Sequence, residues 1–132
     1  TRLVGVEPEV IAKYNVVSAP VAARMALGAA VASGSDIAVS VTGVAGPTGG
    51  DEVRPVGTVY LGAARGDTVY VQKLFVSRPD RALVRARAAQ AALALALRLA
   101  QGKVPAHTKP LAASEQHSAA ALDALNEAFL AE

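Results

Sequence analysis

Residues 36–50 of the chain read DIAVSVTGVAGPTGG, an apolar run that ends at Thr42 and continues into a loop with four glycines and a proline. The branched residues predict a buried strand, and the glycines predict a loop at its carboxyl end. Ligands of α/β proteins usually bind at that edge of the sheet. Glycine lets the backbone approach a ligand closely, and successive N–H groups in such a turn suit a phosphate or an oxyanion. The alternative is a tight connection between two strands.

The composition predicts one domain with a single core. The chain has 132 residues, of which 52% are apolar but only 4% are aromatic, so we expect a core of Ala, Val and Leu. Charged residues make up 18%, fewer than in disordered chains. These values favour helices packed closely on a sheet.

Several classes of protein are disfavoured by charge and by residue usage. The net charge is +2 and no run of five like charges occurs, so we do not expect a nucleic-acid partner. Cysteine is absent, which removes disulfides, thiolate metal sites and a cysteine nucleophile, and favours the cytoplasm. The most apolar helical stretch, residues 88–97, is about half as long as a membrane span, and no signal peptide is found. We therefore expect no membrane partner.

Two helices are predicted before the quoted stretch. Pro8 suits the first turn of a short helix. Ser18 is a good N-cap for a second helix, in which Pro20 is tolerated in the first turn, and Gly34 is the natural stop. For Ser18 we prefer this capping role to that of a nucleophile.

A hairpin is predicted after the glycine-rich loop. Residues 54–64 predict a strand, and residues 68–76 alternate as its hairpin partner. The Arg65-Gly66-Asp67 triplet between them is also an adhesion motif, but we interpret it as the hairpin turn.

The longest helix is predicted next. Pro79 and Asp80 open it, it continues to about Gln101, and Gly102 ends it. Residues 103–113 contain two prolines and are interpreted as a linker.

A last helix is predicted after this linker. Ser114 or Ser118 caps it, and Leu122, Leu125 and Phe129 form an apolar face that we expect to dock on this domain or on a second copy. The order of elements predicts an α/β layered fold, in which a mixed sheet is packed by helices and carries the glycine-rich loop at a strand end. We divide the chain into an α/β domain over residues 1–102, a linker over 103–113 and a C-terminal helix over 114–132.

Four blocks of sequence, in the right order and spacing, closely resemble the CinA C-terminal domain family. Residues 42–50 (TGVAGPTGG) with 54–59 (RPVGTV) resemble the family signature. Residues 17–29 follow the pattern V-S-x-x-V-A-x-x-M-A-x-G-A, and residues 80–85 follow D-R-x-x-V-R. Residues 3–6 (LVGV) resemble a family L-L-G-V. The likeness covers about residues 1–101.

This resemblance implies an amidohydrolase. Characterised members of the family are nicotinamide mononucleotide deamidases, which release ammonia and nicotinic acid mononucleotide. The family's proposed serine nucleophile lies in a T-A-E-S-x-T-G-G motif, and its proposed lysine base lies in Y-S-N-x-x-K. Neither motif occurs in the sequence, and by the spacing the lysine would fall directly before Thr1. We therefore expect a domain that is truncated on its N-terminal side and needs an upstream segment for turnover.

The resemblance also implies site residues. An amide attacked by a serine needs donors for the oxyanion, and a nucleotide needs a phosphate site. Thr42 would assist the nucleophile or base, with capping of the strand end as an equal alternative. Arg81 and Arg85 lie near a helix N-terminus that favours anions, and one of them would bind phosphate, although solvated helix charges are as good an interpretation. The full set of expected substrate-binding residues is Gly43, Ala45, Gly46, Pro47, Gly49, Gly50, Arg81 and Arg85.

No cofactor or metal is expected. His107 and His117 lie in the tail without a ligand partner at short spacing. The expected small-molecule partner is nicotinamide mononucleotide or a related nucleotide, and the apolar helices favour a homo-oligomer. The alternative functions are a nucleotide-binding module that has lost catalysis and an assembly module.

Overall fold

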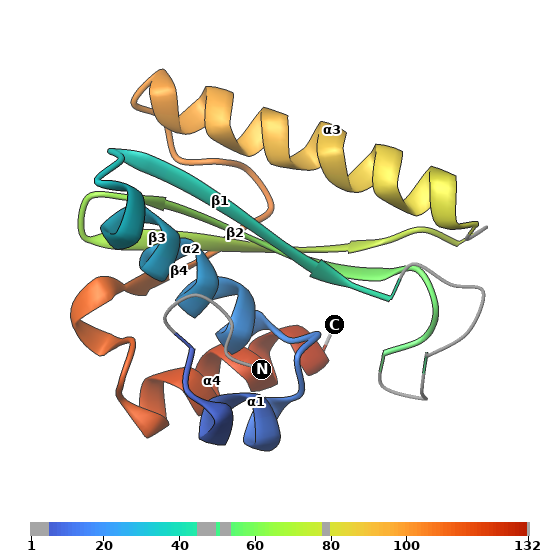
Figure 1. Cartoon of the computed structure of the whole chain (residues 1–132), viewed down its shortest axis with the longest axis horizontal. Coiled ribbons are helices and arrows are strands. Elements are labelled where there is room, and N and C mark those ends of the chain that lie inside the picture. Colours follow the sequence, from blue (N-terminus) through green and yellow to red (C-terminus); the bar gives the residue numbers. More distant parts are fainter. Residues whose placement is uncertain (1–5, 45–49, 51–53, 78–79, 132) are drawn as a thin grey trace.

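The computed structural model describes residues 6–44, 50, 54–77 and 80–131, which form helices on both faces of a four-stranded sheet. In chain order the elements are α1 (Pro8–Tyr14), α2 (Ala19–Ser33), β1 (Ile37–Gly43), β2 (Thr58–Arg65), β3 (Thr68–Phe75), α3 (Arg81–Ala100), β4 (Lys109–Ala112), the 3₁₀ turn η1 (Ala113–Glu115) and α4 (Ala119–Leu130). Figure 1 shows α3 on one face of the sheet and α1, α2 and α4 on the other. The predicted α/β layers are confirmed.

The sheet has the order β1-β2-β3-β4, and every pairing between these strands is antiparallel. We expected a mixed sheet, with both parallel and antiparallel pairings, but the four described strands pair only in the antiparallel direction. Antiparallel strands need only short connections, and here β2 and β3 are joined by the two residues Gly66 and Asp67, with Arg65 paired to Thr68. The triplet at residues 65–67 is therefore the hairpin turn that we predicted.

A seam of small residues brings α2 close to the sheet. Ala22, Ala23 and Ala26 are fully buried against it. A Cβ on Gly62 of β2 would lie 2.4 Å from the Ala22 carbonyl oxygen, so only glycine fits there. The Ser40 hydroxyl from β1 donates a hydrogen bond to the same oxygen at 2.6 Å. Small residues thus set the spacing of this layer.

The helix ends are those that the sequence predicts. Ser18, Asp80 and Ser118 each accept a hydrogen bond from a backbone N–H in the first turn of α2, α3 and α4. Gly34 and Gly102 have φ values of 68° and 74° just past the ends of α2 and α3. These local signals are therefore confirmed.

Two segments differ from the prediction. β2 begins at Thr58 rather than at Arg54, because Pro55 has no N–H to donate and Gly57 has a φ of 101°, which breaks the strand. Within the expected linker, residues 109–112 form β4, which pairs with β3. Pro110 is tolerated there because β3 is the one described partner of this strand, so its missing N–H costs no ladder bond on the outer side.

The last helix, α4, packs on this domain, which is one of the two predicted alternatives for its apolar face. Leu122, Leu125 and Phe129 of α4 are at most 6% exposed and belong to one core cluster with residues of α2, β2 and β3. The Phe129 ring meets the Tyr60 ring edge to face, with 5.7 Å between ring centroids. Among the helices that the structure describes, none combines the length and the apolar character needed to cross a membrane.

Candidate functional site

Side chains donate hydrogen bonds to four successive backbone carbonyls in the turn between α1 and α2. Two donors come from distant parts of the chain, because Thr42 lies at the end of β1 and Arg54 lies in the segment that leads into β2. The third donor, Ser18, is the N-cap of α2. The carbonyl of Tyr14 accepts from Arg54 Nη2 at 2.8 Å, that of Asn15 from Ser18 Oγ at 2.8 Å, that of Val16 from Thr42 Oγ1 at 2.8 Å, and that of Val17 from Arg54 Nε. The turn is thereby fixed to the end of the sheet.

Asn15 has an unusual backbone conformation. Its φ is 77° and its ψ is 154°, outside the αL region that asparagine tolerates, so the contacts around the turn must hold a strained residue. Its side-chain oxygen accepts a hydrogen bond from the Val17 N–H at 3.0 Å. One residue therefore supplies both the unusual dihedral angle and a partner for a backbone donor.

An open hollow of 490 Å³ lies beside the turn. It is lined by the last turn of α1, by Asn15 and Val16, and by Arg54. Lys13 and Arg54 are the cationic residues of this lining, and Lys13 is paired with Asp123.

The charges beside the hollow are fixed by α4. The Tyr14 hydroxyl donates to Asp123 of α4, and Lys13 Nζ lies 3.1 Å from the same carboxylate oxygen. Burial, and then the hydrogen bond to Asp123, raise the pKa of Tyr14 above its ordinary value. The same hydrogen bond, and then Lys13, lower the pKa of Asp123, while Asp123 raises the pKa of Lys13. At neutral pH the three groups therefore stand as a neutral phenol, a carboxylate and an ammonium.

The glycine-rich connection begins at this same end of the sheet. Val44 and Gly57 close it through two backbone hydrogen bonds, from Val44 N–H to the Thr58 carbonyl at 2.8 Å and from Gly57 N–H to the Val44 carbonyl at 2.7 Å. A Cβ on Gly43 would lie 2.9 Å from the Thr58 carbonyl oxygen, and one on Gly50 would lie 2.5 Å from the Val56 nitrogen. Both glycines are thus required by the close approach of the chain to itself. The other expected loop residues, Ala45, Gly46, Pro47 and Gly49, lie outside the described residues.

The expected phosphate-binding arginines lie on the opposite face of the sheet from the turn. Arg81 and Arg85 are exposed in the first turns of α3. Figure 1 shows that α3 begins at the end of the sheet where β1 ends and β2 begins. Asp80 already accepts from the Leu83 N–H at 2.8 Å, so a carboxylate meets the positive end of this helix. The structure brings Thr42 and Arg54 together at the turn and leaves Arg81 and Arg85 apart from it.

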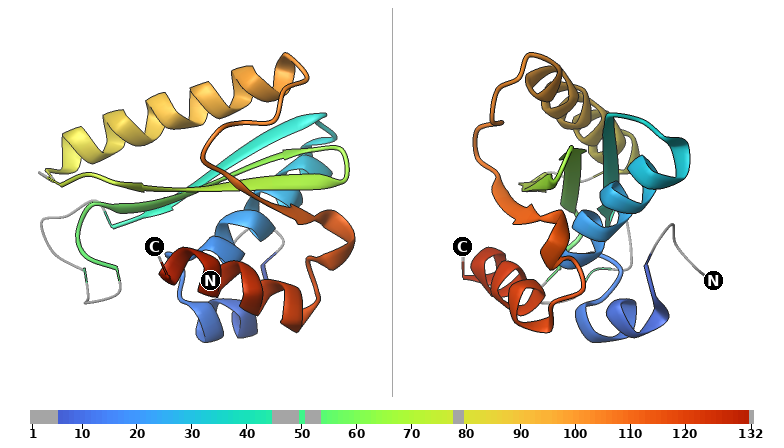
Figure 2. Two further views of the ribbon diagram at one scale, coloured as in Figure 1. Left: turned by 180° about the vertical axis from the view of Figure 1, so that it is seen from behind. Right: turned by 90° about the vertical axis from the view of Figure 1, so that its left-hand side faces the viewer.

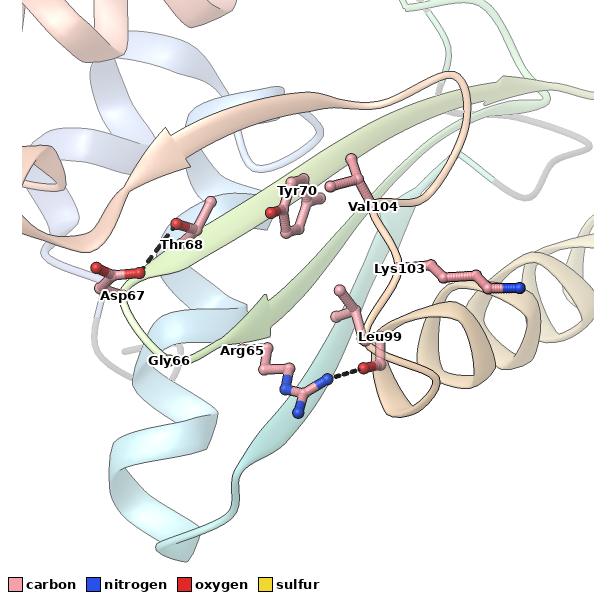
Figure 3. A pocket seen from close by; sticks show the side chains of 9 residues that line it. Arg65, Gly66, Asp67, Thr68, Tyr70, Leu99, Lys103 and Val104 are labelled. Carbon is pink, nitrogen blue, oxygen red and sulfur yellow. Dashed lines mark hydrogen bonds between the residues drawn. The ribbon is translucent and has the colours of Figure 1, made fainter.

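A second hollow, of 420 Å³, lies at the other end of the sheet and contains no predicted site residue. Figure 3 shows the Arg65 side chain reaching from β2 to the Leu99 carbonyl near the end of α3. The Thr68 hydroxyl donates to Asp67 at 3.2 Å beside it. The Arg65 contact fastens the hairpin turn to α3, which is a structural role, and the Thr68 contact lies within the hairpin itself.

Three residues in or around the turn have roles that the sequence analysis did not predict. Arg54 and Asp123 make contacts to residues far away along the chain, and no local pattern signals such contacts. Asn15 follows a short helix, but its ψ of 154° is not that of the αL residue that commonly ends a helix, so no local pattern signals its role either.

Comparison with known proteins gives a family. The model of the CinA C-terminal domain matches residues 1–100. The chain is 43% identical over 94 residues to nicotinamide-nucleotide amidohydrolase PncC of Escherichia coli, a match that covers 70% of this chain and 56% of that protein. It is 51% identical over 85 residues to a CinA-like protein of Geobacter sp., covering 64% of this chain and 20% of that protein.

A solved structure agrees with these sequence matches. The crystal structure of the competence/damage inducible protein CihA from Agrobacterium tumefaciens matches with a TM-score of 0.71 and 34% identity, over 75% of this chain and 61% of that one. The chain thus spans about a fifth of the CinA-like relative and just over half of PncC.

Proposed function

Since the chain belongs to the CinA C-terminal domain family, we propose that it is part of a nicotinamide-nucleotide amidohydrolase, which converts nicotinamide mononucleotide and water to nicotinic acid mononucleotide and ammonia. The observation that carries the proposal is the 43% identity to PncC over 94 residues. The serine and lysine motifs that the resemblance implies do not occur in residues 1–132, so we assign this chain binding and positioning roles.

The proposed roles follow the chemistry of amide hydrolysis. Attack on the carboxamide carbon places negative charge on its oxygen, and backbone N–H groups of the glycine-rich connection would stabilise that charge. The Thr42 hydroxyl donates its hydrogen to the Val16 carbonyl, but the hydroxyl oxygen keeps lone pairs that can accept a hydrogen bond from a nucleophile or base. The same bond supports the alternative, in which Thr42 secures the end of β1. Arg81 or Arg85 would bind the nucleotide phosphate.

Calorimetry with nicotinamide mononucleotide, together with an assay of released ammonia, tests the proposal. We expect saturable binding, and Arg81→Gln or Arg85→Gln should weaken it about 10-fold to 100-fold through the loss of a charge-assisted hydrogen bond. Arg98→Gln is the matched control, because Arg98 is an exposed arginine in the last turn of the same helix. Nicotinamide riboside, which lacks the phosphate, should bind equally to all four proteins.

The ammonia assay is run on this chain and on a form extended by the residues encoded directly upstream of Thr1. No ammonia from the extended form would reject the amidohydrolase. Saturable binding without turnover in both forms would favour the second candidate, a nucleotide-binding module.

A further inference from the structure

The tail of the chain is part of the fold although it lies beyond the residues that the family model matches. That match ends at residue 100, whereas β4 and α4 span residues 109–130. β4 extends the sheet beside β3, and the Ala113 N–H donates to the Asp67 carbonyl at 2.7 Å. α4 buries Leu122, Leu125 and Phe129 in the core that it shares with α2 and the sheet. The tail therefore has a fixed position from which it can act on its neighbours.

One of those neighbours is α1. Both views in Figure 2 place α4 alongside α1, beneath the sheet. The contact consists of the hydrogen bond from the Tyr14 hydroxyl to Asp123 and of the Lys13–Asp123 ion pair at 3.1 Å. Tyr14 is only 6% exposed, so its hydroxyl depends on the protein for a partner.

Tyr14 is held at both of its ends. Its hydroxyl binds the tail, and its carbonyl accepts from Arg54 Nη2 at 2.8 Å. Asn15, the next residue, has the positive φ of the turn, and its N–H donates to the Ile11 carbonyl at 2.8 Å. A displacement of the Tyr14 side chain is therefore passed directly to the backbone of the turn.

We propose that the tail is a built-in positioning element of the candidate site, in which Asp123 fixes the turn at residues 14–17 through Tyr14. The inference rests on the proposed function only for the identity of the ligand. Loss of the carboxylate leaves the buried Tyr14 hydroxyl without its acceptor and releases Lys13. The last turn of α1 then opens more often, and the wall of the hollow beside Arg54 loses its fixed shape.

The variants Asp123→Ala and Tyr14→Phe test this inference by amide hydrogen exchange and calorimetry. We expect the amides of Asn15 and Val17 to exchange about tenfold faster in both variants, while amides of the β2–β3 hairpin keep their rates. Glu127→Ala is the matched control, since Glu127 is an exposed acid one turn further along α4. Asp123→Asn should restore much of the protection, because its amide oxygen can still accept from Tyr14.

The outcomes separate this inference from the proposed function. Unchanged exchange at Asn15 and Val17, or an equal rise throughout the hairpin, would overturn the positioning role and leave α4 as a stabilising helix. Faster local exchange in a protein that does not bind nicotinamide mononucleotide would support the inference and count against the proposed function. Faster local exchange with nucleotide affinity unchanged from wild type would show that the turn is not part of the site.

Discussion

Substitution of Gly62 by alanine is expected to force α2 away from the sheet. The new Cβ would lie 2.4 Å from the Ala22 carbonyl oxygen, whereas a close C···O contact is about 3.3 Å, so the helix must move by about 0.9 Å. Overpacking of this kind costs about 1–3 kcal/mol, and the Ser40–Ala22 hydrogen bond, which the movement breaks, contributes about 1 kcal/mol. Alanine recovers about 0.5–1 kcal/mol of backbone entropy. We expect a net loss of about 2.5 kcal/mol and a fall in Tm of about 10 °C.

Urea unfolding followed by circular dichroism measures this loss, and a double-mutant cycle with Ser40→Ala tests its cause. In the wild-type background Ser40→Ala should cost about 1 kcal/mol. In the Gly62→Ala background it should cost almost nothing, because the bond is already broken. A loss below about 0.5 kcal/mol for Gly62→Ala, or an equal cost of Ser40→Ala in both backgrounds, would refute the reasoning.

Three further outcomes are expected. Thr42→Val keeps the shape of the side chain but removes the donor to the Val16 carbonyl, so the free energy of unfolding in urea titrations should fall by about 1–3 kcal/mol. Thr42→Ser keeps the hydroxyl and should be close to wild type in stability. Phe129→Ala leaves a cavity beside the Tyr60 ring, so the free energy of unfolding measured by thermal denaturation should fall by about 3–5 kcal/mol. Leu130→Ala, at the exposed neighbouring position, should lower it less. The lowered pKa of Asp123 gives the fold stability that is present above the ordinary value of 3.8 and is lost as the pH falls below it. The raised pKa of Tyr14 gives stability that is present below 10.0 and is lost as the pH rises further. In a stability–pH profile Asp123→Ala should remove the contribution of Asp123 to the acid limb but only part of that of Tyr14 to the alkaline limb, because burial of the phenol remains.

The predictable part of the fold is the part that neighbouring residues encode. Ser18 and Asp80 cap the helices that follow them, and Gly34 ends α2, because capping depends on residues within one turn. β4 was missed because Pro110 normally argues against a strand, and only the position at the edge of the sheet makes it acceptable.

The location of the candidate site at the end of β1 stays a prediction, and the contacts made there were only partly predictable. Thr42 lies at the end of β1, with its hydroxyl on the Val16 carbonyl. The binding roles of Thr42, Arg81 and Arg85 stay predictions. Arg54 binds carbonyls 37 and 40 positions earlier in the chain, and Asp123 binds a hydroxyl 109 positions earlier. Contacts at such separations depend on tertiary packing and have no signature in the local sequence.

The late position of β4 and α4 in the chain has a consequence for biosynthesis. Three of the four described strands of the sheet that α4 covers, with Tyr60 and Val71 on the covered face, are present once β3 has been translated. Residues 76–130 must still be translated before Phe129 reaches it, which at 5–20 residues per second takes about 3–11 s. During that interval a nascent apolar surface is open to chaperones, so the yield of folded protein should depend on chaperone supply more than its final stability does.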